Sequence, residues 1–152
     1  MRAVIQRVSS AFVTISGQVK SSIGSGYLIL LGVCEEDTAA DIDWLVHKIV
    51  GLRVFDDEQH VMNRSIMDVL GEVLVVSQFT LYANLHKGNR PSFDGAGKPE
   101  HAERMYELFM QELRNLGFNV QHGIFGAHMH VCYENDGPVT IIADSDDLFG
   151  LK

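Results

Sequence analysis

The sequence predicts an α/β fold, a single domain in which a mixed, layered β-sheet carries two helices packed on one side. Hydrophobic patterns typical of strands occur at both ends of the chain, and two patterns typical of helices each lie between strand patterns. The 152 residues suit one domain and contain no repeat or low-complexity linker. We therefore expect one domain over residues 1–145, followed by an acidic, loosely held tail over residues 146–152.

The first strands are predicted from alternating apolar residues and from glycine turns. The predicted strands cover residues 3–8, 11–16 and 19–23. The run from Tyr27 to Val33 is almost continuously apolar and is bounded by glycine. This pattern is typical of a central strand that is buried on both faces.

The first helix is predicted by a capping signal and by helical spacing. Thr38 and Asp41 resemble a capping box, and apolar residues then recur with helical period until Gly51. Residues 52–55 predict a short strand, and residues 61–70 an irregular connection.

The next strand ends in polar side chains. Residues 73–76 are β-branched or Leu, and Ser77 to Tyr82 continue the run with hydroxyl and amide groups. We interpret this as a strand that extends to Tyr82 and holds polar groups at its end, where a reaction needs rigid positioning. A strand that simply leaves the core would show the same local pattern.

A long loop, a second helix and further strands complete the prediction. Residues 83–98 contain Gly and Pro without periodicity, which is typical of a functional loop. Pro99 suits the first position of a helix whose stripe of Met105, Leu108, Phe109, Leu113 and Leu116 ends at Gly117. The last predicted strands cover residues 118–122, 125–134 and 139–143, and residues 135–138 form a turn between the last two.

The charge of the chain limits its partners. A formal net charge of −8 argues against a protein that coats nucleic acid non-specifically. The basic residues are scattered except in the loop His86 to Arg90, where we expect phosphates to bind. No apolar run reaches the length of a membrane span, and the two cysteines are too few for a disulfide framework. We expect a cytoplasmic protein.

Neither a metal site nor a protein nucleophile is predicted by spacing. His128 and His130 alternate on a predicted strand and could share a metal, but zinc needs a third ligand. We therefore favour a solvated strand face without metal or cofactor. Ser77 and Thr80 carry hydroxyl groups, but a nucleophile needs an adjacent base, and only folding could bring one near.

Five colinear segments resemble the D-aminoacyl-tRNA deacylase family. They are residues 1–8, 77–81, 87–93, 125–127 and 135–140, and the resemblance runs to about Ser145. It departs from the family pattern at residues 83–86 and after Ser145.

The resemblance implies a homodimer that hydrolyses the ester between a D-amino acid and the 3′-terminal adenosine of tRNA. Gly137-Pro138 would be a cis pair that enters the partner's cavity and excludes L-amino acids, so that glycine would also enter. The tRNA 2′-hydroxyl would assist the attack, with main-chain donors near Ser77, Gln78 and Phe79 and with Thr80 in a supporting role. The implied contacts to substrate and tRNA are Phe125, Met129, Asn135, Lys87 and Arg90.

Two other functions remain open from the sequence. One is a general esterase with a Ser or Thr nucleophile, and the other is a non-catalytic tRNA-binding module. The intact segments around Ser77 and Gly137 disfavour the module. The resemblance implies no membrane or DNA partner.

Overall fold

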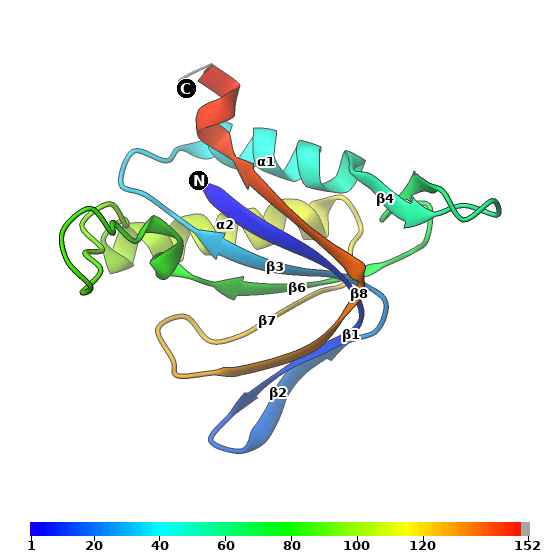
Figure 1. Ribbon diagram of the computed structural model, residues 1–152, viewed down its shortest axis with the longest axis horizontal. Coiled ribbons are helices and arrows are strands. Elements are labelled where there is room, and N and C mark those ends of the chain that lie inside the picture. Colours follow the sequence, from blue (N-terminus) through cyan, green and yellow to red (C-terminus); the bar gives the residue numbers. More distant parts are fainter. Residues whose placement is uncertain (150–152) are drawn as a thin grey trace.

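A computed structural model describes residues 1–149 and confirms the mixed α/β fold (Figure 1). A six-stranded sheet has the order β2-β1-β3-β6-β7, with β8 paired to β1. The elements are β1 (Arg2–Ile15), β2 (Gln18–Ile23), β3 (Gly26–Gly32), α1 (Ala39–Gly51), β4 (Arg53–Asp56), β5 (Met62–Ser65), β6 (Glu72–Ser77), η1 (Phe79–Tyr82), α2 (Pro99–Asn115), β7 (Val120–His122), β8 (His130–Asp144) and η2 (Ser145–Phe149).

Strand β1 organises the sheet. It was predicted as two strands, but it is one continuous strand, which pairs with β3 through its first half and with β2 through its second. Its other edge pairs with β8 from residue 2 to residue 14. All three pairings are antiparallel, whereas β3–β6 and β6–β7 are parallel. The mixed sheet follows from these two sets of pairings.

The sheet curves until it is nearly closed, because β2 approaches β7. The Ser21 hydroxyl donates a hydrogen bond to the carbonyl oxygen of His122 at 2.8 Å. A second apolar cluster lies inside this curve and includes Leu28, Leu74 and Val76. These residues alternate with Ile29, Val73 and Val75 of the main core, as expected for strands buried on both faces.

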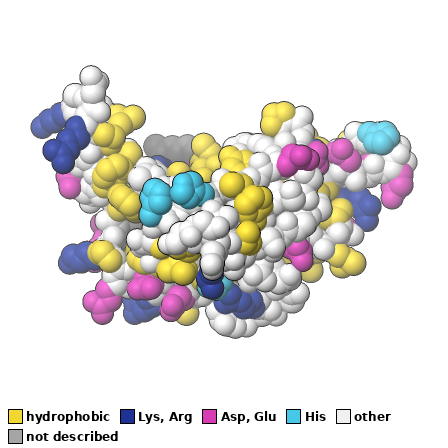
Figure 2. Space-filling model, turned by 90° about the horizontal axis from the view of Figure 1, so that it is seen from below, with side chains coloured by type: hydrophobic (Ala, Val, Ile, Leu, Met, Phe, Trp, Pro, Cys, Tyr) yellow, Lys and Arg dark blue, Asp and Glu magenta, His cyan; other side chains and the backbone are white. Residues whose placement is uncertain are grey.

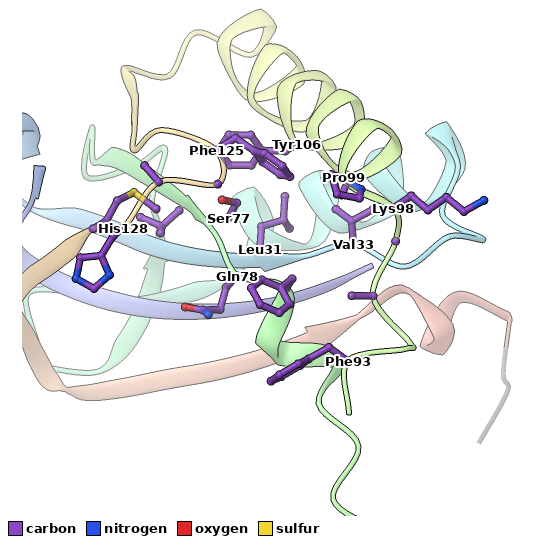
Figure 3. A pocket seen from close by; sticks show the side chains of 18 of the residues that line it. Leu31, Val33, Ser77, Gln78, Phe93, Lys98, Pro99, Tyr106, Phe125 and His128 are labelled. Atoms are coloured by element: carbon purple, nitrogen blue, oxygen red, sulfur yellow. The ribbon is translucent and has the colours of Figure 1, made fainter. Parts of the chain in front are cut away.

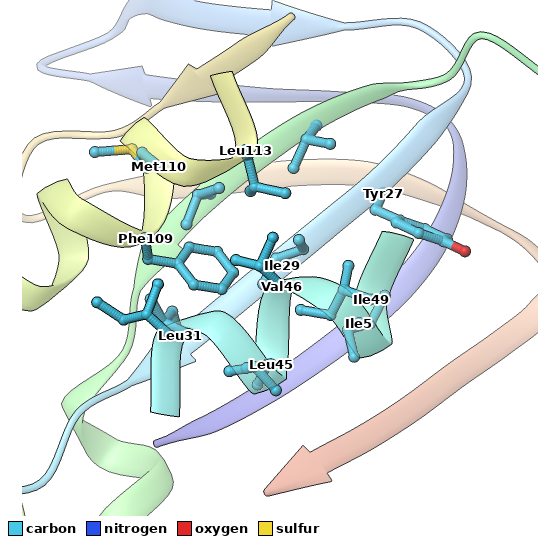
Figure 4. Close-up of a cluster of buried hydrophobic side chains, with 14 of the residues drawn as sticks. Ile5, Tyr27, Ile29, Leu31, Leu45, Val46, Ile49, Phe109, Met110 and Leu113 are labelled. Atoms are coloured by element: carbon cyan, nitrogen blue, oxygen red, sulfur yellow. The ribbon is translucent and has the colours of Figure 1, made fainter. Parts of the chain in front are cut away.

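Both helices pack on the face of the sheet that carries the main core (Figure 4). In α1, the capping box of Thr38 and Asp41 is present, as predicted. In α2, Pro99 takes the first position, and Met105, Phe109 and Leu113 are buried. Leu108 and Leu116 are about half exposed, so the predicted stripe was wrong there. The buried face instead includes Ala102, Tyr106 and Met110.

Three local predictions are corrected by the structure. Residues 61–70 contain β5, which pairs with β4 in a small separate sheet. Residues 135–138 do not form a turn between strands, because β8 runs through them as one strand with irregular register against β1. The strand predicted over residues 125–134 begins only at His130. Ser145, the last residue of the predicted domain, is buried, and its N–H donates to the carbonyl oxygen of Met1. The predicted tail includes residues 150–152, which lie outside the described residues.

Within residues 1–149, no helix is long and apolar enough to cross a membrane.

Candidate active site

A cavity of about 670 Å³ opens at the carboxyl end of β6 (Figure 3). Its walls come from the ends of β3 and β6, from residues 93–98 and the amino-terminal half of α2, and from the segment 125–131. Five of the predicted site residues line it: Ser77, Gln78, Phe79, Phe125 and Met129. The fold therefore brings together two sequence segments that lie far apart in the chain.

The polar end of β6 is a turn and not the predicted strand extension. The strand ends at Ser77, and residues 79–82 form the single 3-10 turn η1. The turn packs closely on β3, because a Cβ at Gly32 would lie 3.1 Å from the Gln78 carbonyl oxygen and from the Leu81 Cβ. Gly32 thus allows the close approach that gives the turn its position.

The first and last strands hold η1 from the other side. Arg2 donates a hydrogen bond to the carbonyl oxygen of Leu81 at 2.9 Å, and its guanidinium lies 5.1 Å from the centre of the Tyr82 ring. Asp144 of β8 forms an ion pair with the same guanidinium at 2.6 Å. Leu81 and Tyr82 are therefore half-buried, while Phe79 is 57% exposed.

The turn determines which main-chain N–H groups can serve a substrate. The Gln78 N–H donates to the carbonyl oxygen of Leu31 at 2.8 Å and is already engaged, contrary to the expectation of a donor there. Phe79 and Thr80 begin η1, and the first N–H groups of a helical turn have no acceptor within that turn. The Gln78 side chain donates to the hydroxyl of Thr80, which is not among the lining residues, and this hydrogen bond supports the turn.

Few side chains in the cavity can exchange protons. The titratable groups among the described lining residues belong to Lys98, Tyr106 and His128. Burial raises the pKa of Tyr106 well above its ordinary value, and its hydroxyl donates to the carbonyl oxygen of Val75 at 2.9 Å. Because this described lining contains no carboxylate, no Asp or Glu there can orient a histidine toward Ser77.

Gly137-Pro138 lies on the surface of β8, outside the cavity of its own chain. The peptide bond between the two residues is cis, as the resemblance implied. Arg7 supports the segment from behind by donating from Nε to the carbonyl oxygen of Asp136 at 3.0 Å. Asn135 accepts a hydrogen bond from the Val139 N–H at 3.1 Å, which fixes the other end of the segment.

The remaining predicted contacts also lie outside the cavity. Lys87 and Arg90 are exposed in the long loop, which is closed by two backbone hydrogen bonds between Asn84 and Ser92. The rings of His128 and His130 lie 5.3 Å apart, and only His128 reaches the cavity. Residues 1–149 contain no group of three or more His, Cys, Asp or Glu side chains that could hold a metal.

Comparison with known proteins identifies the family. A family model described as D-Tyr-tRNA(Tyr) deacylase matches residues 4–144. The chain belongs to this deacylase family. A D-aminoacyl-tRNA deacylase of Symbiobacterium thermophilum is 54% identical over 98% of this chain and 99% of the relative. One from Bacteroides thetaiotaomicron is 58% identical over 95% of this chain and 97% of the relative. The expected family and the assignment as an enzyme are confirmed.

Two solved structures support the same fold. One, called "c-Myc DNA Unwinding Element Binding Protein", matches with a TM-score of 0.89 and 44% identity, covering 95% of this chain and 98% of that chain. Another, described as a probable eukaryotic D-amino acid tRNA deacylase, matches with a TM-score of 0.80 over 93% of this chain and 97% of that chain. Its identity is 15%, so it shows the deacylase fold alone.

Several residues in and around the candidate site were not predicted from the sequence. Tyr106 and Ala102 line the cavity from α2, on the same buried face as Phe109. The available signal was a tyrosine at helical spacing from Ala102 and Phe109 on an apolar helix face. Arg7 lies on the buried side of β1 together with Ala3 and Ile5. A charged residue at such a core position indicates that the guanidinium has a hydrogen-bond or ion-pair partner.

Proposed function

We propose that this protein hydrolyses the ester bond between a D-amino acid and the 3′-terminal adenosine of tRNA, and that residues 1–145 form the catalytic domain. The observation that carries the proposal is the cavity in which Ser77, Gln78 and Phe79 meet Phe125. Its volume of about 670 Å³ lies within the usual range for small-molecule sites and suits a nucleoside with an attached amino acid. The proposed location is the cytoplasm, and the expected absence of cofactor, metal and DNA partner stays a prediction.

The aromatic side of the cavity suits the adenosine. The Phe125 and Tyr106 rings lie 6.0 Å apart, and the Tyr106 hydroxyl is held by the carbonyl oxygen of Val75. An apolar wall with a fixed ring favours a flat base. Met129 is an adaptable apolar residue of the same lining.

The protein contributes position and hydrogen-bond donors, and the tRNA contributes the proton-transfer group. The terminal 2′-hydroxyl is adjacent to the ester and would assist the attack by water. The Phe79 N–H would stabilise the oxyanion that develops on the ester carbonyl, an effect commonly worth about 2.7–4 kcal/mol per donor. This division of roles agrees with the absence of a carboxylate from the described cavity lining.

The proposed chiral filter is the Gly137-Pro138 segment of a second copy of the chain. Both residues are exposed and outside their own cavity, and Arg7 and Asn135 hold the segment from the protein side. A supported backbone segment can exclude an L side chain by a steric clash. Glycine has no side chain, so glycyl-tRNA would also enter. The proposed assembly is therefore a homodimer.

Matched D-tyrosyl-tRNA and L-tyrosyl-tRNA, incubated with the protein and a chelator, test the proposed function. We expect release of tyrosine from the D ester alone. Equal loss of both esters would favour the general esterase and contradict the chiral filter. Tight tRNA binding without release of either amino acid would favour the non-catalytic module.

Replacement of Thr80 by Ala should leave deacylation within about tenfold of the wild-type rate. Thr80 is exposed and is not among the lining residues, and its hydroxyl accepts a hydrogen bond from Gln78, so its proposed role is support of η1. Single-turnover rates with D-tyrosyl-tRNA measure the effect. A loss approaching the roughly millionfold drop of a serine hydrolase without its nucleophile would show that Thr80 is the nucleophile.

Replacement of Arg90 by Ala should weaken tRNA binding and reduce the slope of log K against log salt by about one. Figure 2 shows Lys and Arg side chains gathered at the end of the molecule where Figure 1 places the loop of Arg90. Titrations with unacylated tRNA at several salt concentrations measure the slope. Lys20→Ala removes an exposed charge from β2 and should leave the slope unchanged. An unchanged slope in Arg90→Ala would refute the phosphate contact.

A further inference from the structure

Two aromatic side chains on the cavity wall are only partly buried by the rest of the fold. The Phe79 and Phe93 rings meet edge to face, with centroids 5.0 Å apart and an angle of 73° between their planes. Both residues line the cavity, yet Phe79 is 57% exposed and Phe93 is half-buried. Figure 3 shows Phe93 on the same side of the cavity as Gln78. The edge contact holds one ring against the other and leaves aromatic surface open.

The same pair adjoins the basic loop. Phe93 directly follows the backbone pairing of Asn84 with Ser92, which closes the loop that carries Lys87 and Arg90. Lys98 lines the cavity at the start of α2, and its ammonium group, which lies 3.9 Å from the Glu35 carboxylate, is on a side chain that is 83% exposed. In Figure 2, hydrophobic side chains lie next to the gathered Lys and Arg side chains at this end of the molecule. Cations beside open aromatic rings are the combination that binds single-stranded nucleic acid.

We propose that Phe79 and Phe93 form a stacking site for the base of the nucleotide that precedes the terminal adenosine. The inference rests on the proposed function, because it takes the terminal adenosine to fill the cavity. The tRNA 3′ end is single-stranded, so the base of its preceding cytidine is free to stack on an aromatic ring. That nucleotide must leave the cavity along one of its walls, and the wall with Phe79 and Phe93 leads to the basic loop.

The test compares D-tyrosyl esters of three short substrates: adenosine, the dinucleotide CpA, and the same dinucleotide with an abasic first position. Stacking is commonly worth 1–3 kcal/mol per base, or about 5-fold to 150-fold. We therefore expect kcat/KM to be at least about fivefold higher for CpA than for adenosine, with most of this gain lost for the abasic dinucleotide. An equal gain from the abasic dinucleotide would overturn the inference, because the phosphate alone would then account for it.

The ratio of CpA to adenosine activity, measured in each variant, shows which side chain forms the stacking site. Phe93→Ala should reduce the ratio of CpA to adenosine activity toward one, and Phe93→Tyr should restore it because the ring is kept. Leu85→Ala is the matched control, since Leu85 is 68% exposed in the same loop and is not among the lining residues. A full gain in Phe93→Ala would also overturn the inference.

Binding of unacylated CpA and adenosine separates failure of this inference from failure of the proposed function. If the wild-type protein binds CpA at least about fivefold more tightly than adenosine and Phe93→Ala does not, the stacking site is supported even if no ester is hydrolysed. If D esters are hydrolysed but CpA and adenosine bind equally, the stacking site is refuted and the deacylase function stands.

Discussion

A D-tyrosyl-tRNA that lacks the terminal 2′-hydroxyl should be hydrolysed about a hundredfold to ten-thousandfold more slowly than the intact substrate. This range is the usual contribution of one positioned proton-transfer group. The described lining of the cavity offers Lys98, Tyr106 and His128 as titratable groups, and burial raises the pKa of Tyr106 so that it stays protonated. The protein therefore has few means to replace the missing hydroxyl.

The measurement is a single-turnover rate with D-tyrosine esterified to the 3′-hydroxyl of tRNA ending in 2′-deoxyadenosine. The matched control is binding of the two unacylated tRNAs, which should differ by less than about tenfold if the hydroxyl acts in the reaction and not in recognition. An unchanged rate would show that the protein supplies its own base or nucleophile. The general esterase would then be the better assignment.

Replacement of Gly137 by Ala should lower the ratio of D-ester to L-ester hydrolysis by about a hundredfold, or about 2.7 kcal/mol. Gly137 has a φ of +126°, in a region that L residues rarely adopt. An added Cβ would lie 3.0 Å from the Arg7 guanidinium and from the Val139 side chain. The Arg7 and Val139 side chains would have to give by a few tenths of an ångström, and the positive φ strains an Ala at this position. We expect the segment to shift in response, and in the proposed homodimer the steric filter would shift with it.

Gly17→Ala provides the matched control for Gly137→Ala. Gly17 also has a positive φ, +79°, but nothing lies within 4 Å of an added Cβ, and the residue belongs to the turn between β1 and β2. The Gly17→Ala substitution should lower the stability of the protein slightly and leave the ratio of D-ester to L-ester hydrolysis unchanged. The proposed filter would be refuted if Gly137→Ala retained the wild-type ratio, with thermal melting to confirm that both variants are folded.

Most elements of the fold could be predicted because their local signals agreed with their environment. The run from Tyr27 to Val33, the capping box at Thr38 and the Pro99 helix start all lie where the sequence placed them. The continuity of β8 could not be predicted, because Asn-Asp-Gly-Pro is a turn sequence and only pairing with β1 keeps the strand extended. The turn at Phe79 depends on the close approach to Gly32, which local sequence does not encode.

The sequence predicted which residues form the candidate site better than it predicted how these residues are arranged. Family resemblance indicated Ser77 to Thr80, Phe125 and Met129, and the cavity brings all of these except Thr80 into its lining. The engagement of the Gln78 N–H by β3 and the position of Tyr106 depend on pairings between distant segments. Such contacts have no local signature, so spacing along the chain could not show them.

The pairing of β1 with β8 has a consequence for synthesis on the ribosome. Strand β1 leaves the ribosome more than a hundred residues before β8, the strand that pairs with its outer edge. At roughly 5–20 residues per second, that edge stays open for on the order of ten seconds in each nascent chain. An unpaired strand edge is a template for association with other chains. Newly made molecules should therefore depend more on chaperones than the finished fold does, and slower translation should lower the soluble yield.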